Sequence, residues 1–133
     1  MIKVFGHKSP DTDSTGSPII WAWYLSEHRK QPAEAKLLGE PNTEAAFVLK
    51  KWNLKKPEII SGIAAGDKVV IVDTNNPAEL PEGINSADII QIIDHHKLTG
   101  GLETSFLPNT VTNSPIVKRD TVTSVIIGMR YEF

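Results

Sequence analysis

The sequence predicts an α/β domain with a mostly parallel central sheet flanked by helices. Three apolar runs support this fold class, at residues 2–5, 69–72 and 89–93. The two later runs are continuous and rich in Val and Ile, as expected of strands that are covered on both faces. Each run ends in histidine or aspartate residues. Ligands of open parallel sheets bind beyond the carboxyl ends of the strands, so these ends are the candidate site.

The segment after the first run holds the densest group of metal-type ligands. Its Gly6 and Pro10 oppose a regular helix, so we expect a loop there. Ser14 and Thr15 then offer hydroxyls that could cap a following helix. The candidate ligands in this segment are His7, Asp11 and Asp13.

The two later runs repeat this design. The run at residues 69–72 ends in Asp73, and the run at residues 89–93 ends in Asp94, His95 and His96. Parallel strands all point the same way, so the residues that follow them converge. One aspartate after a strand usually caps a helix, but three such clusters in one chain indicate a shared metal site.

The rest of the chain supplies helices and shorter strands. We expect helices over residues 17–29, 42–52 and 121–131, the second of them capped by Asn42 or Thr43. Shorter strands are expected at residues 35–39, 58–60, 110–112 and 115–117. The signal is weak from residue 102 onward.

Length and composition describe an ordinary globular domain. The 133 residues fit one domain, with 40% hydrophobic and 23% charged residues. The formal net charge of −2 gives no electrostatic case for nucleic acid or an anionic membrane. Without cysteine there is no disulfide, thiolate zinc site or cysteine nucleophile. No leader-like or membrane-spanning run occurs, and we expect a cytoplasmic protein.

Histidine and aspartate ligands without sulfur suit manganese, cobalt or magnesium ions. Several carboxylates in a small volume repel one another unless cations neutralise them, and two ions with one bridging carboxylate would do so. Asp73 is the best bridging candidate because it stands alone between the other two clusters. A paired-metal site activates a water and holds a phosphoryl oxygen. We therefore expect hydrolysis of a phosphate ester or anhydride, with a purely structural metal as the alternative.

Three segments together resemble the motifs of the DHH phosphoesterase superfamily: residues 7–13, 72–73 and 94–97. The match is closest to the manganese-dependent family II inorganic pyrophosphatases and extends from the start of the chain to about Ser105. It implies hydrolysis of pyrophosphate by a water that bridges two manganese ions, with no covalent enzyme intermediate. Cobalt or magnesium could replace manganese.

The resemblance also implies a role for each metal ligand. His7 and Asp11 would hold the first ion, and Asp13 and His95 the second. Asp73 would bridge the two ions, which agrees with the separate argument from its place in the sequence.

Three further residues take roles around the substrate in this resemblance. His96 would donate a hydrogen bond to the substrate phosphate, and Lys97 would assist it. Asp94 would not bind an ion itself but would orient a neighbouring histidine through a hydrogen bond, as metal-ligand imidazoles generally require. The family also pairs its first domains through sheet edges, so a homodimer is expected.

The chain departs from the family after His96. Family members carry a further aspartate ligand and a second domain whose Ser-Arg-Lys type motif clamps the pyrophosphate, and nothing later in this sequence matches either feature. Residues 121–129 do resemble the helix that follows the Asp-His-His motif. We therefore expect residues 1–133 to form a single, incomplete DHH-type domain without the substrate-clamping domain, and with weak activity alone.

Two other functions stay open at this point. One is a different DHH phosphoesterase, such as an exopolyphosphatase or a phosphodiesterase acting on oligonucleotides or nucleotides. Those nucleotide enzymes often carry Gly between the two aspartates of the first motif and Pro after Asp-His-His, where this chain has Thr12 and Lys97. The other is a metal-binding fragment without turnover.

Overall fold

The structure is a computed structural model that describes residues 1–102. The segments predicted at residues 110–112, 115–117 and 121–131 lie outside the described residues. Within the described part, no helix is long and apolar enough to cross a membrane.

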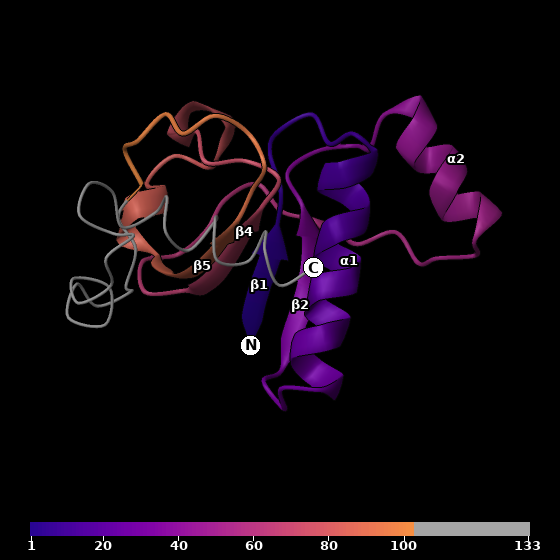
Figure 1. Ribbon diagram of the computed structural model, residues 1–133, viewed down its shortest axis with the longest axis horizontal. Coiled ribbons are helices and arrows are strands. Elements are labelled where there is room, and N and C mark those ends of the chain that lie inside the picture. Colours follow the sequence, from indigo (N-terminus) through magenta and orange to yellow (C-terminus); the bar gives the residue numbers. More distant parts are fainter. Residues whose placement is uncertain (103–133) are drawn as a thin grey trace.

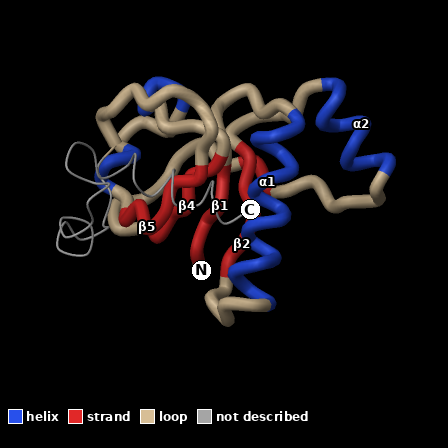
Figure 2. The backbone as a smooth tube through the Cα atoms, viewed as in Figure 1, coloured by secondary structure: helices blue, strands red, loops and turns tan. Residues whose placement is uncertain are grey.

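A five-stranded sheet forms the centre of the described chain, and every strand pairs in parallel with its neighbours (Figures 1 and 2). The predicted α/β fold is therefore confirmed. The strand order is β3-β2-β1-β4-β5. The strands are β1 (Ile2–Phe5), β2 (Ala33–Leu37), β3 (Glu58–Ile59), β4 (Lys68–Val72) and β5 (Asp88–Ile93).

This strand order puts side by side the three strand ends that precede the candidate ligands. β1 pairs with both β2 and β4, so Val4 lies opposite Ala35 on one side and Val70 on the other. The chain runs from β1 outward to β2 and β3, and then returns to place β4 on the other side of β1. Such a reversal opens a crevice at the carboxyl ends of the two central strands, where doubly wound folds bind ligands.

Helix α1 (Thr12–Glu27) covers one face of the sheet, and α2 (Thr43–Lys51) packs beside α1 (Figure 1). Ala22 and Leu25 of α1 are buried against the β1 and β4 side chains. The opposite face is covered by the segment between β4 and β5, which buries Leu80 and Ile84. β4 is thus enclosed on both sides, as its continuous Val and Ile run predicted.

Helix α1 begins five residues earlier than predicted. Its N-cap is Asp11, whose side chain accepts a hydrogen bond of 3.0 Å from the Ser14 backbone N–H, so the expected caps Ser14 and Thr15 are wrong. Pro18 lies inside the helix instead of near its start. As a result, Asp13 belongs to the first helical turn and not to a loop.

Strand β2 also begins two residues before the predicted strand. The Ile2 N–H donates to the Pro32 carbonyl at 2.9 Å, which starts the pairing with β1 at Ala33. The prediction for α2 is confirmed, with Asn42 as its cap.

Gly6 lets the first turn of α1 lie directly on the end of β1. A Cβ atom at this position would stand 2.5 Å from the Ser14 Oγ and 2.6 Å from the Ser14 Cβ. Real Cβ atoms do not approach so closely, so any side chain at position 6 would push α1 away from the strand end.

Replacing Gly6 with Ala is therefore expected to lower the free energy of unfolding by about 1–3 kcal/mol, the usual cost of overpacking. Urea denaturation monitored by circular dichroism measures this change. The matched control is Gly16→Ala on the same helix, where nothing lies within 4 Å of an added Cβ. Helical Ala is favoured over Gly by roughly 0.5–1 kcal/mol, so the control should gain stability. Equal stability of Gly6→Ala and the unmodified chain would contradict the close approach.

Candidate metal centre

Asp73 occupies the end of β4 in an unusual backbone conformation. Its φ angle is 61°, in the left-handed region that non-glycine residues seldom adopt. Four non-glycine residues of the described chain share this feature, and Asp73 is the one that is buried, at 6% exposure. Its backbone N–H donates to the Ile93 carbonyl at 2.8 Å, so the end of β5 holds the conformation in place. Such strained, well-supported positions concentrate at functional sites.

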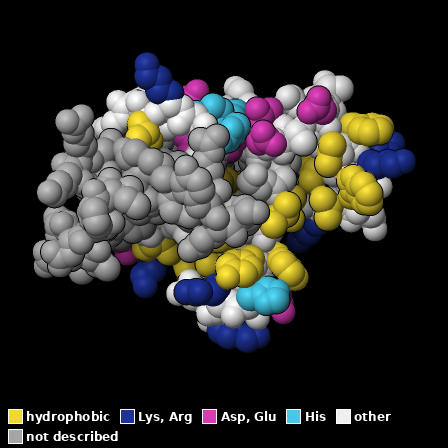
Figure 3. Space-filling model, in the orientation of Figure 1, with side chains coloured by type: hydrophobic (Ala, Val, Ile, Leu, Met, Phe, Trp, Pro, Cys, Tyr) yellow, Lys and Arg dark blue, Asp and Glu magenta, His cyan; other side chains and the backbone are white. Residues whose placement is uncertain are grey.

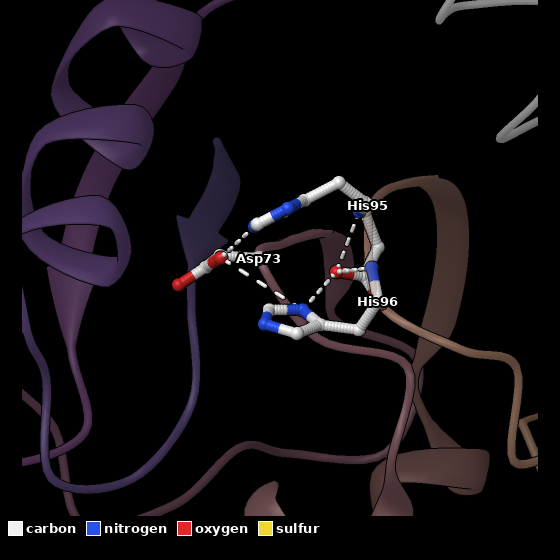
Figure 4. Close-up of side chains that lie close together, drawn as sticks. Asp73, His95 and His96 are labelled. Carbon is white, nitrogen blue, oxygen red and sulfur yellow. Dashed lines mark hydrogen bonds and ion pairs between the residues drawn. The ribbon is translucent and has the colours of Figure 1, made fainter.

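The two carboxylate oxygens of Asp73 face different histidines. Oδ2 accepts a hydrogen bond of 2.7 Å from the Ser14 hydroxyl and lies 3.4 Å from His7 Nε2. Oδ1 lies 3.1 Å from His95 Nε2 and 3.9 Å from His96 Nδ1 (Figure 4). One buried carboxylate therefore connects the cluster after β1 with the cluster after β5.

Two groups among residues 1–102 could hold an ion. The first consists of His7, Asp11 and Asp73, whose ligand atoms all lie within 4.8 Å of one another. His7 Nε2 is 3.7 Å from Asp11 Oδ1. The other ring nitrogen, Nδ1, lies 2.6 Å from the Lys8 carbonyl oxygen, which can only accept a hydrogen bond. Nδ1 therefore donates to this carbonyl, so Nε2 is the ring nitrogen that faces the two carboxylates and could bind an ion.

The second group consists of Asp73, Asp94, His95 and His96. Asp94 Oδ1 accepts three hydrogen bonds from the histidines beside it. These come from the backbone N–H groups of His95 and His96, at 2.8 and 3.2 Å, and from His96 Nδ1 at 2.6 Å. Asp94 thus orients the His96 ring while His95 Nε2 points toward Asp73.

These contacts shift the pKa values of Asp94 and His96 in opposite directions. Burial alone would raise the pKa of the Asp94 carboxyl, but hydrogen bonds from Asn75 and His96 outweigh it and hold that pKa below its usual range. The hydrogen bond to Asp94 raises the pKa of His96. Asp94 is therefore ionised at neutral pH, and the protonated form of His96 is favoured. A protonated imidazole donates hydrogen bonds to anions but cannot ligate a metal.

A cavity of about 180 Å³ adjoins the two groups. Its walls include His7 and His96 from the groups, together with Lys97 and Asn75. The expected substrate-binding residues His96 and Lys97 therefore share one wall of a cavity beside the expected metal ligands. In the space-filling view, histidine and acidic side chains adjoin at the top edge of the molecule (Figure 3).

Most of the predicted site residues come together, but Asp13 does not. Its side chain is exposed in the first turn of α1, and it belongs to neither ligand group of the described residues. Two polar residues of the site were not assigned from the sequence. They are Ser14, which bonds Asp73, and the buried Asn75, which bonds Asp94. Asn75 stands two positions after Asp73, just beyond the end of β4, and this position could have identified it as a site residue from the sequence.

Comparison with known proteins agrees with this geometry. The model of the DHH family, N-terminal domain, matches residues 1–131. A Deinococcus radiodurans protein named a probable manganese-dependent inorganic pyrophosphatase is 39% identical over 98 residues, which cover 74% of this chain and 31% of the relative. An Archaeoglobus fulgidus protein of the same name is 35% identical over 127 residues, covering 87% of this chain and 38% of the relative.

A solved structure is also similar to this chain in fold and sequence. The crystal structure of a Methanococcus jannaschii protein assigned to the family II inorganic pyrophosphatases aligns with a TM-score of 0.69 and 36% sequence identity. The alignment covers 80% of this chain and 32% of that protein. The chain thus spans about a third of the length of the relatives it matches. With a family match over nearly its whole length, and with candidate ligands gathered after three neighbouring strands, the chain belongs to the DHH family and corresponds to its N-terminal domain.

Proposed function

We propose that this chain is the metal-binding part of a manganese-dependent inorganic pyrophosphatase. One observation carries the proposal. Asp73 belongs to both ligand groups, and each of its oxygens faces a different one. A carboxylate in this position can bridge two cations, and paired cations are the device by which many enzymes hydrolyse phosphate esters and anhydrides.

The donor atoms fit manganese. All are imidazole nitrogens or carboxylate oxygens, and the chain has no cysteine to favour softer metals. Two adjacent ligands bound about 2.1 Å from a common ion in octahedral geometry lie about 3 Å apart. Asp73 lies 3.4 Å from the His7 nitrogen and 3.1 Å from the His95 nitrogen, so both pairs are already near that separation.

The proposed ligand roles follow the two groups. His7 and Asp11 would hold one ion and His95 the other, with Asp73 common to both. The family resemblance assigns Asp13 to the second ion as well. Because its side chain is exposed and outside both groups, we expect Asp13 to contribute less to affinity than Asp73.

Bound manganese would supply the Lewis acidity that activates a water and neutralises phosphoryl charge. The chain's own residues would orient the substrate. His96, whose pKa is raised by its bond to Asp94, would donate to a phosphoryl oxygen from the wall of the cavity, and Lys97 would add positive charge beside it. Donors aimed at developing charge are among the largest contributions to catalysis.

Pyrophosphate is the proposed substrate because the relatives above carry pyrophosphatase names. The second domain expected from the family would complete the site. A homodimer through a sheet edge is proposed as well, and β3 and β5 are the edges of the described sheet.

The first prediction concerns manganese affinity. Replacing Asp73 with Asn removes the negative charge and leaves one ligating oxygen in place of two, so residue 73 can no longer bridge two ions in this way. This change should lower the affinity of the chain for Mn²⁺ more than any other single ligand change. Isothermal titration calorimetry measures the affinity and the number of ions bound. Asp13→Asn is the matched comparison, because it removes the same charge from a side chain outside both groups. Affinity of Asp73→Asn equal to that of the unmodified chain would refute the bridging role.

The second prediction concerns turnover. The 133-residue polypeptide contains no Ser-Arg-Lys run and no later aspartate in the expected setting. Loss of one well-placed donor costs about 10²–10³ in rate, and more than one is missing. Phosphate release from pyrophosphate with saturating Mn²⁺ should therefore lie below the ordinary enzyme range of about 1–10³ per second. Ordinary turnover would show that the polypeptide is a complete enzyme. Faster cleavage of a dinucleotide in the parallel assay would favour the phosphodiesterase alternative.

A further inference from the structure

A buried amide connects the two loops that carry the candidate site. Asn75 lies in the loop after β4 and is 3% exposed. Its side chain reaches across to the loop after β5, where it contacts Asp94, Lys97 and Thr99.

Every hydrogen-bonding position of this amide is occupied. Nδ2 donates to Asp94 Oδ2 at 2.5 Å and to the Lys97 carbonyl at 3.1 Å. Oδ1 accepts from the Thr99 N–H at 2.8 Å and from the Thr99 hydroxyl at 3.0 Å. The reversed amide would set its oxygen against the Asp94 carboxylate, so the orientation is fixed by its partners.

This contact complements the histidine contacts of Asp94. The histidines use Oδ1, and Asn75 bonds Oδ2. With both oxygens held, the Asp94 carboxylate cannot rotate, and the His96 ring that bonds it keeps one orientation. The bonds to Lys97 and Thr99 hold the next residues of the same loop along the wall of the cavity.

We infer that Asn75 is a positioning residue, which sets the orientation of His96 through Asp94 and holds the loop of residues 94–99 against the end of β4. The inference deepens the proposed function, because His96 is the proposed phosphate donor. It concerns the hydrogen bonds of the metal-free chain, so it can be tested without turnover.

The test uses the full chain and two variants. Asn75→Asp keeps the acceptor toward Thr99, loses both donors and sets a second carboxylate against Asp94. Thr99→Val removes the hydroxyl that bonds the Asn75 side chain and backbone carbonyl, without adding charge, and its exposed position poses little risk to folding. The control is Asn53→Asp, which makes the same charge change at an exposed residue after α2.

The first readout is the imidazole ¹H–¹⁵N correlation spectrum of His96 in the metal-free proteins at one pH. We expect its ring-nitrogen signals to move strongly in Asn75→Asp, to move less in Thr99→Val and to stay unchanged in Asn53→Asp. A purely structural role would lower the melting temperature and leave these signals in place. The second readout is Mn²⁺ affinity by calorimetry, which tests the proposed function separately, because Asn75 bonds none of the proposed metal ligands.

A change in the His96 signals of either variant, with the control unchanged, supports the inference. The inference is overturned if the His96 signals of both variants match those of the unmodified chain. If Asn75→Asp does not fold, Thr99→Val decides alone. Failure of the unmodified chain to bind Mn²⁺ would overturn the proposed function, while the His96 spectra would still judge the role of Asn75.

Discussion

The placement of one buried carboxylate, that of Asp73, organises the site. Two interactions hold it from opposite sides. Its backbone N–H bonds the end of β5, and its side chain accepts from Ser14 in the first turn of α1. Ser14 reaches Asp73 because Gly6 lets α1 lie against the end of β1. A left-handed backbone costs of order 1–3 kcal/mol and persists only where the surroundings support it, as these contacts do.

The two buried aspartates, Asp73 and Asp94, differ in how many hydrogen bonds their carboxylate oxygens already accept. Oδ1 of Asp94 accepts three hydrogen bonds from the histidine pair, and Oδ2 is bonded by Asn75. Asp73 accepts one strong bond, from Ser14, and otherwise faces histidine ring nitrogens. Asp94 is therefore suited to orient its neighbours and Asp73 to bind cations. This difference favours Asp73 as the bridge on grounds separate from the sequence motif.

Three carboxylates around the candidate site would also couple metal binding to folding. Asp11, Asp73 and Asp94 come from segments after three different strands, and their negative charges repel one another unless cations are near. A bound ion would stabilise the sheet edge where these segments meet, because ligands that bind the folded state raise its stability. The candidate site lies at the switch between β1 and β4 because the strand order reverses there, which separates the connections that follow the two strand ends.

The sequence alone determined the α/β class and the strands that precede the candidate ligands, because the continuous Val and Ile runs and the residues that follow them are local features. It also predicted the cluster around Asp73, because the carboxyl ends of parallel strands lie at one edge of a sheet. The position of Asp13 was not predictable in the same way. It depended on where α1 begins, which the Asp11 cap and the close approach at Gly6 decide. Ser14 and Asp73 are 59 residues apart in sequence, and Asn75 and Asp94 are 19 apart. Only the tertiary structure brings such partners together. A hydrogen bond requires its two atoms to lie about 3 Å apart, and a pair of residues distant in the chain leaves no repeating pattern in the sequence that would predict this.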